Sequence, residues 1–480
     1  MTHFQQARWN EPPIWEVRLP EAVTGTEQGE IPAALRRKTP FRWPAPTELE
    51  VARHYTRLSQ MNFSIETGIY PLGSCTMKYN PRINEILARD PLIAGTHPSQ
   101  PEETVQGTLE MLYRLEEALG KITGLPNVSL QPAAGAHGEF TALLVARAHF
   151  RRKGEPRTEV ILPDTAHGTN PASSSMAGFT SREIPSLNGC VDLPALTDAL
   201  SDKTAVFMLT NPNTAGLFEE DVLEIADRVH SHGALLYYDG ANMNAIVGKT
   251  SPGKMGFDLA HLNLHKTFST PHGGGGPGAA ALCVTDALAE YLPVPRLVKE
   301  GRKFRWTYDL PHSIGKVRSF YGNTGMDLRA YAYITAHGED GLRRSSERAV
   351  LNSNYLAHRL GKHLPRPFKP LVKHEFVLSG KPLHDRGLRT LDLAKRLLDD
   401  GVHAPTVYFP SLVEESLMVE PPETEPKSSL DAFYDIFVRA LNDPDERIRT
   451  APRNLSVARV DEVAAAKNLK LSWRDLERSP

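Results

Sequence analysis

The sequence predicts an α/β fold, with a mostly parallel sheet in a large domain, a smaller C-terminal α/β domain and an extended N-terminal arm. Three observations support this fold class: short apolar runs end in polar or small residues, helical patterns separate these runs, and the composition changes past residue 345. Strands that alternate with helices form parallel sheets. We therefore divide the chain into an arm over residues 1–60, a large domain over residues 61–345 and a small domain over residues 346–480.

The N-terminal arm combines many prolines, from Pro12 onward, with the tryptophans Trp9, Trp15 and Trp43. Prolines in this number break helices, whereas a disordered tail seldom contains three tryptophans. We therefore expect an extended arm that packs on the body of the protein or on a partner subunit. Removal of residues 1–45 should then change the oligomeric state or the stability.

The large domain is expected to begin with a helix from residue 102, in which apolar residues recur at steps of three and four and whose end is bracketed by Gly120 and Gly124. Four apolar runs with the character of strands follow it. They are 160–162 before PDTAHGTN, 205–209 before TNPNTAG, 234–238 before DGANMN, and 261–264 before HKTFSTPHGGGGPG. Because the carboxyl ends of parallel strands meet at one edge of a sheet, we expect the chemistry at these ends.

The small domain begins with a long polar helix, GLRRSSERAVLNSNYLAHRL, and continues as an alternation of short strands and helices. The predicted strands lie at 375–378, 407–409 and 417–420, and the predicted helices lie around 391–398 and over 430–441. This alternation predicts a second, smaller α/β unit.

The charge balance and the cysteines exclude several classes of protein. Lys plus Arg number 55 and Asp plus Glu number 57, so the net charge of −2 excludes nucleic acid or an anionic membrane as the main partner. No apolar run approaches the roughly 20 residues of a membrane span, and the N-terminus lacks the layout of a signal peptide. Cys75, Cys190 and Cys283 lie far apart, which argues against a disulfide framework or a cysteine zinc site. We expect a cytoplasmic protein with reduced thiols and no metal.

Lys266 follows one apolar run and precedes a glycine-rich turn, which would present its amine at a strand end. Any of the 55 basic residues is more often a surface residue, but a lysine in a desolvated pocket can form a Schiff base with an aldehyde. Asp239 follows the preceding run, so the two residues would lie at the same edge of the sheet. A buried carboxylate needs a partner, and a protonated pyridine nitrogen would be one. The alternative for Asp239 is a helix cap or a turn.

A run of small residues begins the helical pattern after QPAAGAHGE. Gly135, Ala136, His137 and Gly138 would form its first turn, where free backbone N–H groups and the helix dipole can bind a phosphate. Many helices that begin with glycine and alanine bind nothing, so this signal is weak alone.

Two further strand ends carry candidate groups for a planar ligand. His167, in PDTAHGTN, could stack on an aromatic ring or exchange protons at neutral pH, although a structural histidine is more common. Thr210, Asn211 and Asn213 could donate hydrogen bonds to ring substituents, although Asn-Pro turns usually serve only geometry.

The glycine cluster HGGGGPG at 272–278 fits neither the GxGxxG nor the Walker spacing, which argues against a nucleotide site. A flexible surface loop is one interpretation. The other, which we favour because Lys266 lies six residues upstream, is a backbone floor beside the lysine.

Four stretches of the chain resemble glycine decarboxylase, the P-protein of the glycine cleavage system. They are YPLGSCTMKYNP at 70–81, AHGTNPAS at 166–173, DGANMNA at 239–245 and HLNLHKTFSTPHGGGGPG at 261–278. The resemblance runs over most of residues 60–440 and implies the architecture of a fold-type I pyridoxal-phosphate enzyme. The length fits only the carboxyl-terminal half of the long two-lobed form, so the chain is similar to subunit 2 of the split bacterial enzyme.

The resemblance implies three principal roles around pyridoxal 5'-phosphate. Lys266 would form the Schiff base, Asp239 would pair with the pyridine nitrogen, and His167 would stack on the ring and take part in catalysis. We also assign Thr210, Ala241 and His265 to the cofactor site.

The resemblance further implies a phosphate site at Ala134, Gly135 and Ala136. A YGNT segment with Tyr321 and Gly322, from a neighbouring chain, would complete it. No such role is assigned to His137.

The activity implied by the resemblance is the decarboxylation of glycine, followed by transfer of the aminomethyl group to the lipoyl arm of H-protein. The partners would be H-protein and a homologous subunit 1, in a heterotetramer. Cys75 is expected near the entrance without a covalent role. Two alternatives remain open: an aminotransferase or simple amino-acid decarboxylase of the same fold, and a scaffold subunit without catalysis. The presence of Lys266, Asp239 and His167 argues against the scaffold.

Overall fold

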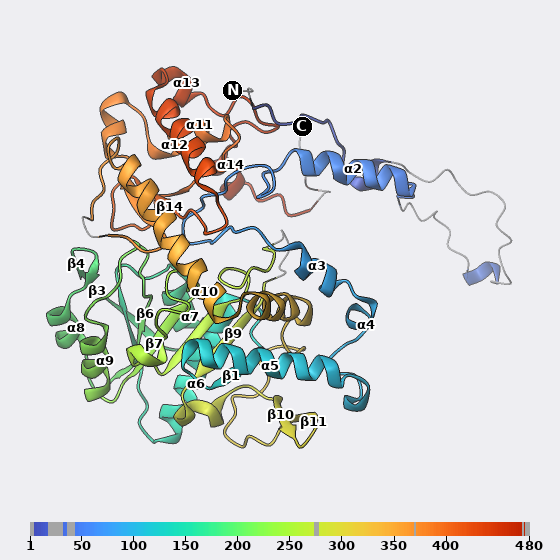
Figure 1. The fold of residues 1–480 in the computed structure, drawn as a ribbon, viewed down its shortest axis with the longest axis vertical. Coiled ribbons are helices and arrows are strands. Elements are labelled where there is room, and N and C mark those ends of the chain that lie inside the picture. The colour runs from blue at the N-terminus through green and yellow to red at the C-terminus, as the bar shows by residue number, and fades with distance from the viewer. Residues whose placement is uncertain are drawn as a thin grey trace.

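The computed structural model describes residues 4–17, 32–35, 44–272, 278–368, 371–472 and 475. Figure 1 shows two bodies: a larger one around a central sheet, and a smaller one formed by the C-terminal part of the chain. Helix α10, Thr324–Leu360, runs from the first body into the second and kinks at Gly338, whose φ is 59°. The predicted boundary at residue 345 lies inside this helix.

A seven-stranded sheet forms the centre of the larger body. In spatial order its strands are β1 Asn127–Ser129, β9 Ala280–Val284, β8 Leu259–Asn263, β7 Leu235–Gly240, β6 Thr204–Leu209, β2 Glu159–Pro163 and β3 Thr180–Ile184. The neighbouring pairs from β8 to β3 are parallel, and only β9 runs antiparallel to its neighbours β8 and β1. The predicted α/β fold with a mostly parallel sheet is therefore confirmed.

Helices cover this sheet, and its central strands are consequently buried and mostly apolar. All residues of β6, β8 and β9 are buried. The helices of the larger body are α3 Arg82–Ala88, α4 Pro91–Ala94, α5 Gln106–Thr123, α6 Gly135–Arg152, α7 Thr169–Met176, α8 Leu193–Ala199 and α9 Val222–Ser231. Two short antiparallel pairs lie outside the sheet: β4 Ser186–Leu187 with β5 Cys190–Val191, and β10 Arg296–Glu300 with β11 Lys303–Thr307.

Helix α5 begins later than the sequence predicted. Residues Glu102–Thr104 form a single 3-10 turn, and the α-helix starts at Gln106. The Glu102 side chain accepts the backbone N–H of Trp306 at 2.8 Å, so it joins this turn to β11. The helix ends as expected at Gly124, which has a left-handed φ of 70°.

The smaller body contains a three-stranded antiparallel sheet in the order β12 Phe376–Ser379, β14 Ser416–Val419 and β13 Thr406–Val407. Helices α11 Thr390–Leu398, α12 Lys427–Asn442 and α13 Asp445–Arg449 pack with it, and α14 Glu462–Lys467 follows. The aromatic residues Phe376, Phe433 and Phe437 are buried in a separate hydrophobic cluster. The second body therefore has its own core.

The first described residues, 4–11, lie against the smaller body and helix α2. The backbone N–H of Gln6 donates to the Asn454 carbonyl at 3.0 Å, and Glu11 pairs with His54 and Arg57 of helix α2. Besides the single turn α1, Ile14–Val17, this region contains helix α2, Glu48–Gln60.

Helix α2 differs from the expected extended chain. No proline follows Pro46 until residue 71, and Thr47 and Glu50 form a capping box that starts the helix. Trp43, on which the prediction also relied, lies outside the described residues. Among the described residues no helix is long and apolar enough to cross a membrane.

Candidate active site

The carboxyl ends of β2, β6, β7 and β8 surround a cavity of about 330 Å³. Its lining brings together most of the predicted cofactor residues: Gly135, Ala136, His167, Thr210, Asp239, Ala241, His265 and Lys266. Ala134 is the residue directly before helix α6, so it lies next to this group. The separate strand ends thus converge at one edge of the sheet, as parallel topology requires.

Lys266 lies in a tight turn just after β8, where its backbone N–H donates to the Asn263 carbonyl at 3.1 Å. Its side chain reaches across the cavity, and Nζ donates a hydrogen bond to the backbone carbonyl of Ser74 at 2.6 Å. Among the described residues it forms no ion pair. The amine is therefore held in place by a neutral group that a covalent partner could displace.

Asp239 lies near the end of β7 and is 2% exposed. Its carboxylate accepts the backbone N–H of Ala241 at 3.0 Å and the Asn170 side-chain amide at 3.1 Å. His261 also lies near, with Nε2 3.6 Å from Oδ1. Burial pushes the pKa up, but His261 and these hydrogen bonds outweigh it, so the pKa of Asp239 lies below its ordinary value. The group is an anion at neutral pH that could pair with a ring cation.

His167 follows β2 and lines the same cavity. Its Nδ1 lies 2.9 Å from the hydroxyl of Thr169, which donates a hydrogen bond to Glu139 at 2.8 Å. Burial lowers the pKa of His167; the negative charge of Asp239 opposes this shift, and the positive charge of Lys266 adds to it. The imidazole is therefore mainly neutral at pH 7, as a residue that packs on an aromatic ring should be.

The start of helix α6 has the features of a phosphate site. A Cβ added at Gly135 would lie 2.4 Å from Oδ1 of Asn263, so only glycine leaves this space open. The helix has no side-chain cap, and the N–H groups of Gly135 and Ala136 donate to no acceptor among the described residues. The positive end of the dipole of this 18-residue helix lies at Gly135, where it favours an anion such as a phosphate.

A second observation supports a polar ligand in the cavity. The Thr210 hydroxyl is buried without a hydrogen-bond partner among the described residues, as are Oδ1 of Asn263 and Nε2 of His272. All three residues line the cavity. Buried polar atoms without partners are costly, so the lining is suited to a ligand that supplies those hydrogen bonds. Together with Lys266 and Asp239, this lining fits pyridoxal phosphate.

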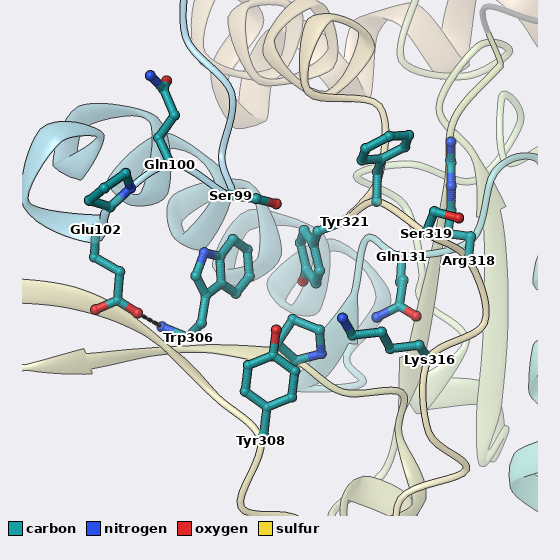
Figure 2. A pocket seen from close by; sticks show the side chains of 13 residues that line it. Ser99, Gln100, Glu102, Gln131, Trp306, Tyr308, Lys316, Arg318, Ser319 and Tyr321 are labelled. Carbon is teal, nitrogen blue, oxygen red and sulfur yellow. Dashed lines mark hydrogen bonds between the residues drawn. The ribbon is translucent and has the colours of Figure 1, made fainter.

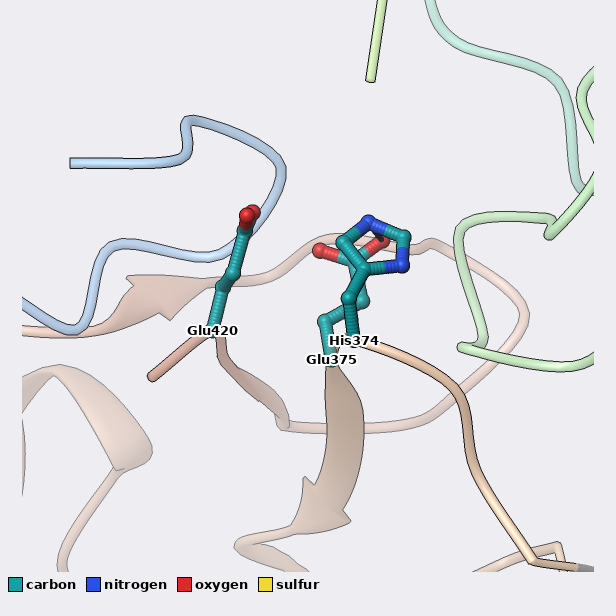
Figure 3. A group of neighbouring side chains, drawn as sticks. All are labelled: His374, Glu375 and Glu420. Atoms are coloured by element: carbon teal, nitrogen blue, oxygen red, sulfur yellow. Dashed lines mark ion pairs between the residues drawn. The ribbon is translucent and has the colours of Figure 1, made fainter. Parts of the chain in front are cut away.

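The opposite wall comes from the smaller body and was not predicted. Figure 3 shows His374, Glu375 and Glu420, whose potential ligand atoms lie within 4.8 Å of one another. The carboxylates are already occupied: Glu375 accepts the N–H of Ser74 at 2.7 Å, and Glu420 accepts the N–H of Thr76 at 3.1 Å. These two glutamates therefore hold the turn whose carbonyl meets Lys266.

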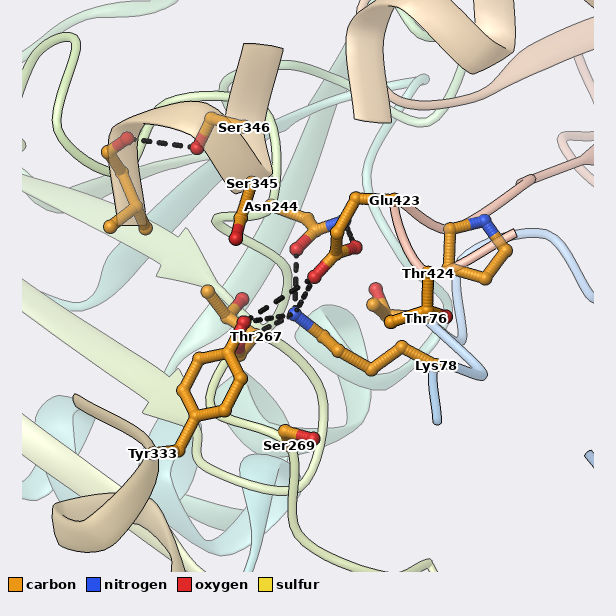
Figure 4. A network of polar contacts seen from close by, with 12 residues as sticks. Thr76, Lys78, Asn244, Thr267, Ser269, Tyr333, Ser345, Ser346, Glu423 and Thr424 are labelled. Carbon is orange, nitrogen blue, oxygen red and sulfur yellow. Dashed lines mark hydrogen bonds and ion pairs between the residues drawn. The ribbon is translucent and has the colours of Figure 1, made fainter. Parts of the chain in front are cut away.

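A buried network lies behind the cavity, shown in Figure 4. Nζ of Lys78 contacts Oε1 of Glu423 at 2.6 Å, the Thr267 carbonyl at 2.8 Å and Oδ1 of Asn244 at 3.0 Å. The Tyr333 hydroxyl lies 3.4 Å from the same Nζ. Because Thr267 directly follows the predicted Schiff-base lysine, this network joins the lysine turn to α10 and to the smaller body.

Tyr321 and Gly322 do not reach the cavity within the same chain. Figure 2 shows Tyr321 in a separate cavity of about 450 Å³, lined also by Trp306, Lys316 and Arg318. Its hydroxyl donates to the buried carboxylate of Glu116. A role at the phosphate site of a neighbouring chain stays a prediction.

Two sequence predictions concern residues at the rim. Residues 273–277 of the glycine cluster lie outside the described residues, so the predicted backbone floor lies there too. His265 and His272 contact each other at this rim, and burial lowers the pKa of each to about 4. Cys75 lines the cavity, and burial raises its pKa, so its side chain is a neutral thiol.

Comparison with solved structures identifies the fold. The structure is similar to the crystal structure of glycine decarboxylase (P-protein) of the glycine cleavage system in inhibitor-bound form, with a TM-score of 0.72 and 21% identity, over 86% of this chain and 93% of that chain. It is also similar to glutamate decarboxylase of Lactobacillus brevis, with a TM-score of 0.67 and 14% identity, over 86% and 97% of the two chains. The chain has the fold of the fold-type I pyridoxal-phosphate enzymes.

Sequence comparison identifies the family. Residues 23–303 match the profile of the glycine cleavage system P-protein, and residues 345–454 match that of the glycine dehydrogenase C-terminal domain. The probable glycine dehydrogenase (decarboxylating) subunit 2 of Thermoplasma volcanium is 52% identical over 475 residues, which cover 98% of this chain and 100% of that protein. The protein of the same description from Pyrococcus horikoshii is 52% identical over 491 residues, 98% and 97% of the two. The chain belongs to the glycine cleavage system P-protein family.

Proposed function

We propose that this chain is the pyridoxal-phosphate-binding subunit 2 of a glycine decarboxylase. It would release carbon dioxide from glycine and transfer the aminomethyl group to the lipoyl arm of H-protein. The observation that carries this proposal is the position of Lys266 and Asp239, which line one cavity with the uncapped start of helix α6. Family membership at 52% identity over almost the whole chain supports it.

Each side chain of the cavity has a task in this proposal. Lys266 would hold the cofactor through a Schiff base and release it to the amino group of glycine. Asp239 would keep the pyridine nitrogen protonated, and His167 would cover the ring. The N–H groups at Gly135 and Ala136 would bind the phosphate. When bound, pyridoxal phosphate supplies the electron sink for the electrons left at the substrate carbon after carbon dioxide departs.

The finer assignments of partners and location also belong to this proposal. A homologous subunit 1 would pair with this chain in an α2β2 heterotetramer, and Tyr321 with Gly322 would then complete a phosphate site across an interface. H-protein would present its lipoyl arm to the cavity, and the assembly would work in the cytoplasm.

Co-expression with the sister subunit tests the proposal. We expect a visible absorbance band from the cofactor bound to lysine, and exchange of labelled bicarbonate with the glycine carboxyl group that depends on the lipoyl carrier. A band with transamination but without carrier-dependent exchange would indicate an aminotransferase. A chain that folds and assembles but shows no band would indicate a scaffold.

A further inference from the structure

A buried carboxylate in the wall of the cavity is connected to the His167 imidazole through one threonine hydroxyl. Glu139, in the first turns of α6, is 4% exposed, and its Oε1 lies 2.8 Å from Oγ1 of Thr169. The same Oγ1 lies 2.9 Å from Nδ1 of His167. We propose that Glu139, Thr169 and His167 form a proton relay that supplies the cavity with the proton consumed in the reaction. The inference rests on the proposed function.

The hydrogen-bond geometry makes the three groups a continuous path. The Thr169 hydroxyl carries one proton and lies between an acceptor on each side, so it donates to one neighbour and accepts from the other. The second oxygen of Glu139 accepts the Ser173 hydroxyl at 3.0 Å and is off the path. Among the described residues Nε2 of His167 has no hydrogen-bond partner, so this nitrogen is the end that can serve a ligand.

The path has two proton arrangements, which differ by the one proton that is delivered from Nε2 of His167. In the first, protonated Glu139 donates to Thr169, and the Thr169 hydroxyl donates to Nδ1 of His167. In the second, Nδ1–H of His167 donates to the Thr169 hydroxyl, and the hydroxyl donates to the Glu139 carboxylate. This arrangement gives up the 3.3 Å hydrogen bond that the Thr169 backbone N–H donates to Nδ1. Passage from the first to the second moves one proton from Oε1 to Nδ1, so a proton can leave from Nε2 while the ring stays neutral.

The surroundings place Glu139 where both arrangements are accessible at neutral pH. Burial, with a smaller effect from the charge of Asp239, raises the pKa of Glu139 to about 7. No described cation pairs with it. The other ionisable groups that face the path are His261 beside Gly138, Lys266 across the cavity, and Tyr237 on β7.

The balance of the proposed reaction requires a proton. The carbon–carbon bond to the carboxylate breaks, a carbon–sulfur bond to the lipoyl arm forms, and the sulfur–sulfur bond breaks. The disulfide is the oxidant, and its departing sulfur leaves as a thiolate. Glycine enters as a zwitterion and the aminomethyl product carries an ammonium, so the thiolate needs one proton from outside. A buried acid that is half protonated near pH 7 is a suitable reservoir.

A structural role for Glu139 makes a different prediction. As a simple acceptor for the hydroxyls of Thr169 and Ser173, it would stabilise the start of α7 without affecting protonation of His167. Three variants separate the two roles. Glu139→Gln and Thr169→Val interrupt the path, whereas Thr169→Ser keeps the hydroxyl. Ser173→Ala is the matched control, because it removes a contact to the same carboxylate but leaves the path intact.

The first readout uses the full chain without cofactor. The imidazole resonances of His167, assigned by comparison with His167→Asn, are followed by NMR from pH 5 to pH 9. In the native chain and in Ser173→Ala and Thr169→Ser we expect an inflection near pH 7 that reports Glu139. This inflection should be absent in Glu139→Gln and Thr169→Val. The same His167 titration in all five proteins would overturn the relay.

The second readout uses the holoenzyme with its sister subunit and lipoyl carrier. With the cofactor band unchanged, we expect Glu139→Gln and Thr169→Val to lower aminomethyl transfer about tenfold or more, and Thr169→Ser to stay within about threefold. If the native holoenzyme has no band and no exchange, the proposed function fails and the relay has no reaction to serve. If it is active and the interrupted variants match it, only the relay is overturned.

Discussion

The buried Lys78 and the half-buried Lys266 are held in opposite ways. Nζ of Lys78 is surrounded by a carboxylate, an amide oxygen, a backbone carbonyl and a hydroxyl, the shortest contact being 2.6 Å to Glu423. Nζ of Lys266 has one hydrogen bond within the described part of the chain, to the Ser74 carbonyl, and Lys266 lines an open cavity. The first lysine is fixed by its partners, whereas the second is positioned and left available.

The difference shows that the fold uses one lysine, Lys78, for structural support and leaves the other, Lys266, free to react. A buried ammonium is tolerated only if its charge and its donors are satisfied, as they are at Lys78. Lys78 then contacts the carbonyl of Thr267, the residue that follows Lys266, so the satisfied lysine supports the turn that presents the available one. Four predictions test this division, from the largest expected effect to the smallest.

Replacement of the available lysine should abolish activity. Lys266→Ala removes the amine that would bind the cofactor, so we expect turnover to fall by at least about a thousandfold with an unchanged fold. Bicarbonate exchange and circular dichroism check the two parts. The exposed Lys249 gives a matched control, since Lys249→Ala should keep full exchange. Exchange that survives in Lys266→Ala would refute the assignment.

Replacement of the fixed lysine should instead destabilise the protein. Lys78→Met leaves Glu423 buried without its cation, so the free energy of unfolding should fall by about 3–5 kcal/mol. Urea unfolding measures the change. The double variant Lys78→Met with Glu423→Leu removes both charges and should recover much of the loss. An equally low stability in the double variant would mean that packing, and not the uncompensated charge, sets the effect.

Asp239 belongs with the available lysine, and its replacement should weaken cofactor binding. Asp239→Asn keeps the shape and removes the charge, so we expect the dissociation constant for pyridoxal phosphate to rise about thirtyfold, which corresponds to roughly 2 kcal/mol. Absorbance titration of the apoprotein gives this constant. Affinity equal to that of the native chain would argue against a pairing with the pyridine nitrogen.

The ion pair between Lys78 and Glu423 should also make the stability of the protein depend on pH. Burial alone would raise the pKa of Glu423, but the Lys78 charge outweighs burial and holds this pKa below its ordinary value. Burial alone would lower the pKa of Lys78, but Glu423 outweighs it and raises this pKa. The stability from Glu423 is therefore present above its unfolded pKa of about 4.3 and is lost as the pH falls through the lower folded value. That from Lys78 is present below about pH 10.4 and is lost only as the pH rises through a higher value.

The gap in unfolding free energy between the native chain and Lys78→Met is the quantity to follow. It should be constant from about pH 6 to pH 9 and should shrink by about 1 kcal/mol or more near pH 3. Urea unfolding at these pH values measures it. A gap that does not change with pH would contradict an ionised pair.

The sequence predicted the strand ends because their signal is local. The apolar runs before His167, Thr210, Asp239 and Lys266 end abruptly in polar residues, and parallel topology brings such ends together. The antiparallel pairing of β9 and the start of α5 were not predicted, since each depends on contacts with distant segments.

The residues that the sequence missed act through tertiary contacts. Glu375 and Glu420 lie about 300 residues or more from the Ser74–Thr76 turn that they hold, and no periodicity reports such a contact. Glu139 was nearer to detection, because it lies in a helical pattern of mostly small and apolar residues, where a buried glutamate is rare. Its partner Thr169 follows His167 by two positions, but only the fold places Glu139 beside it.

Borohydride reduction of the holoenzyme tests the central claim most directly. Reduction fixes a Schiff base as a stable adduct, and peptide mass spectrometry then locates the modified lysine. We predict a pyridoxyl group on Lys266, which lines the cavity, and none on Lys78, which is buried. An adduct on Lys78 or on a surface lysine, with Lys266 unmodified, would contradict the division between the supporting and the available lysine.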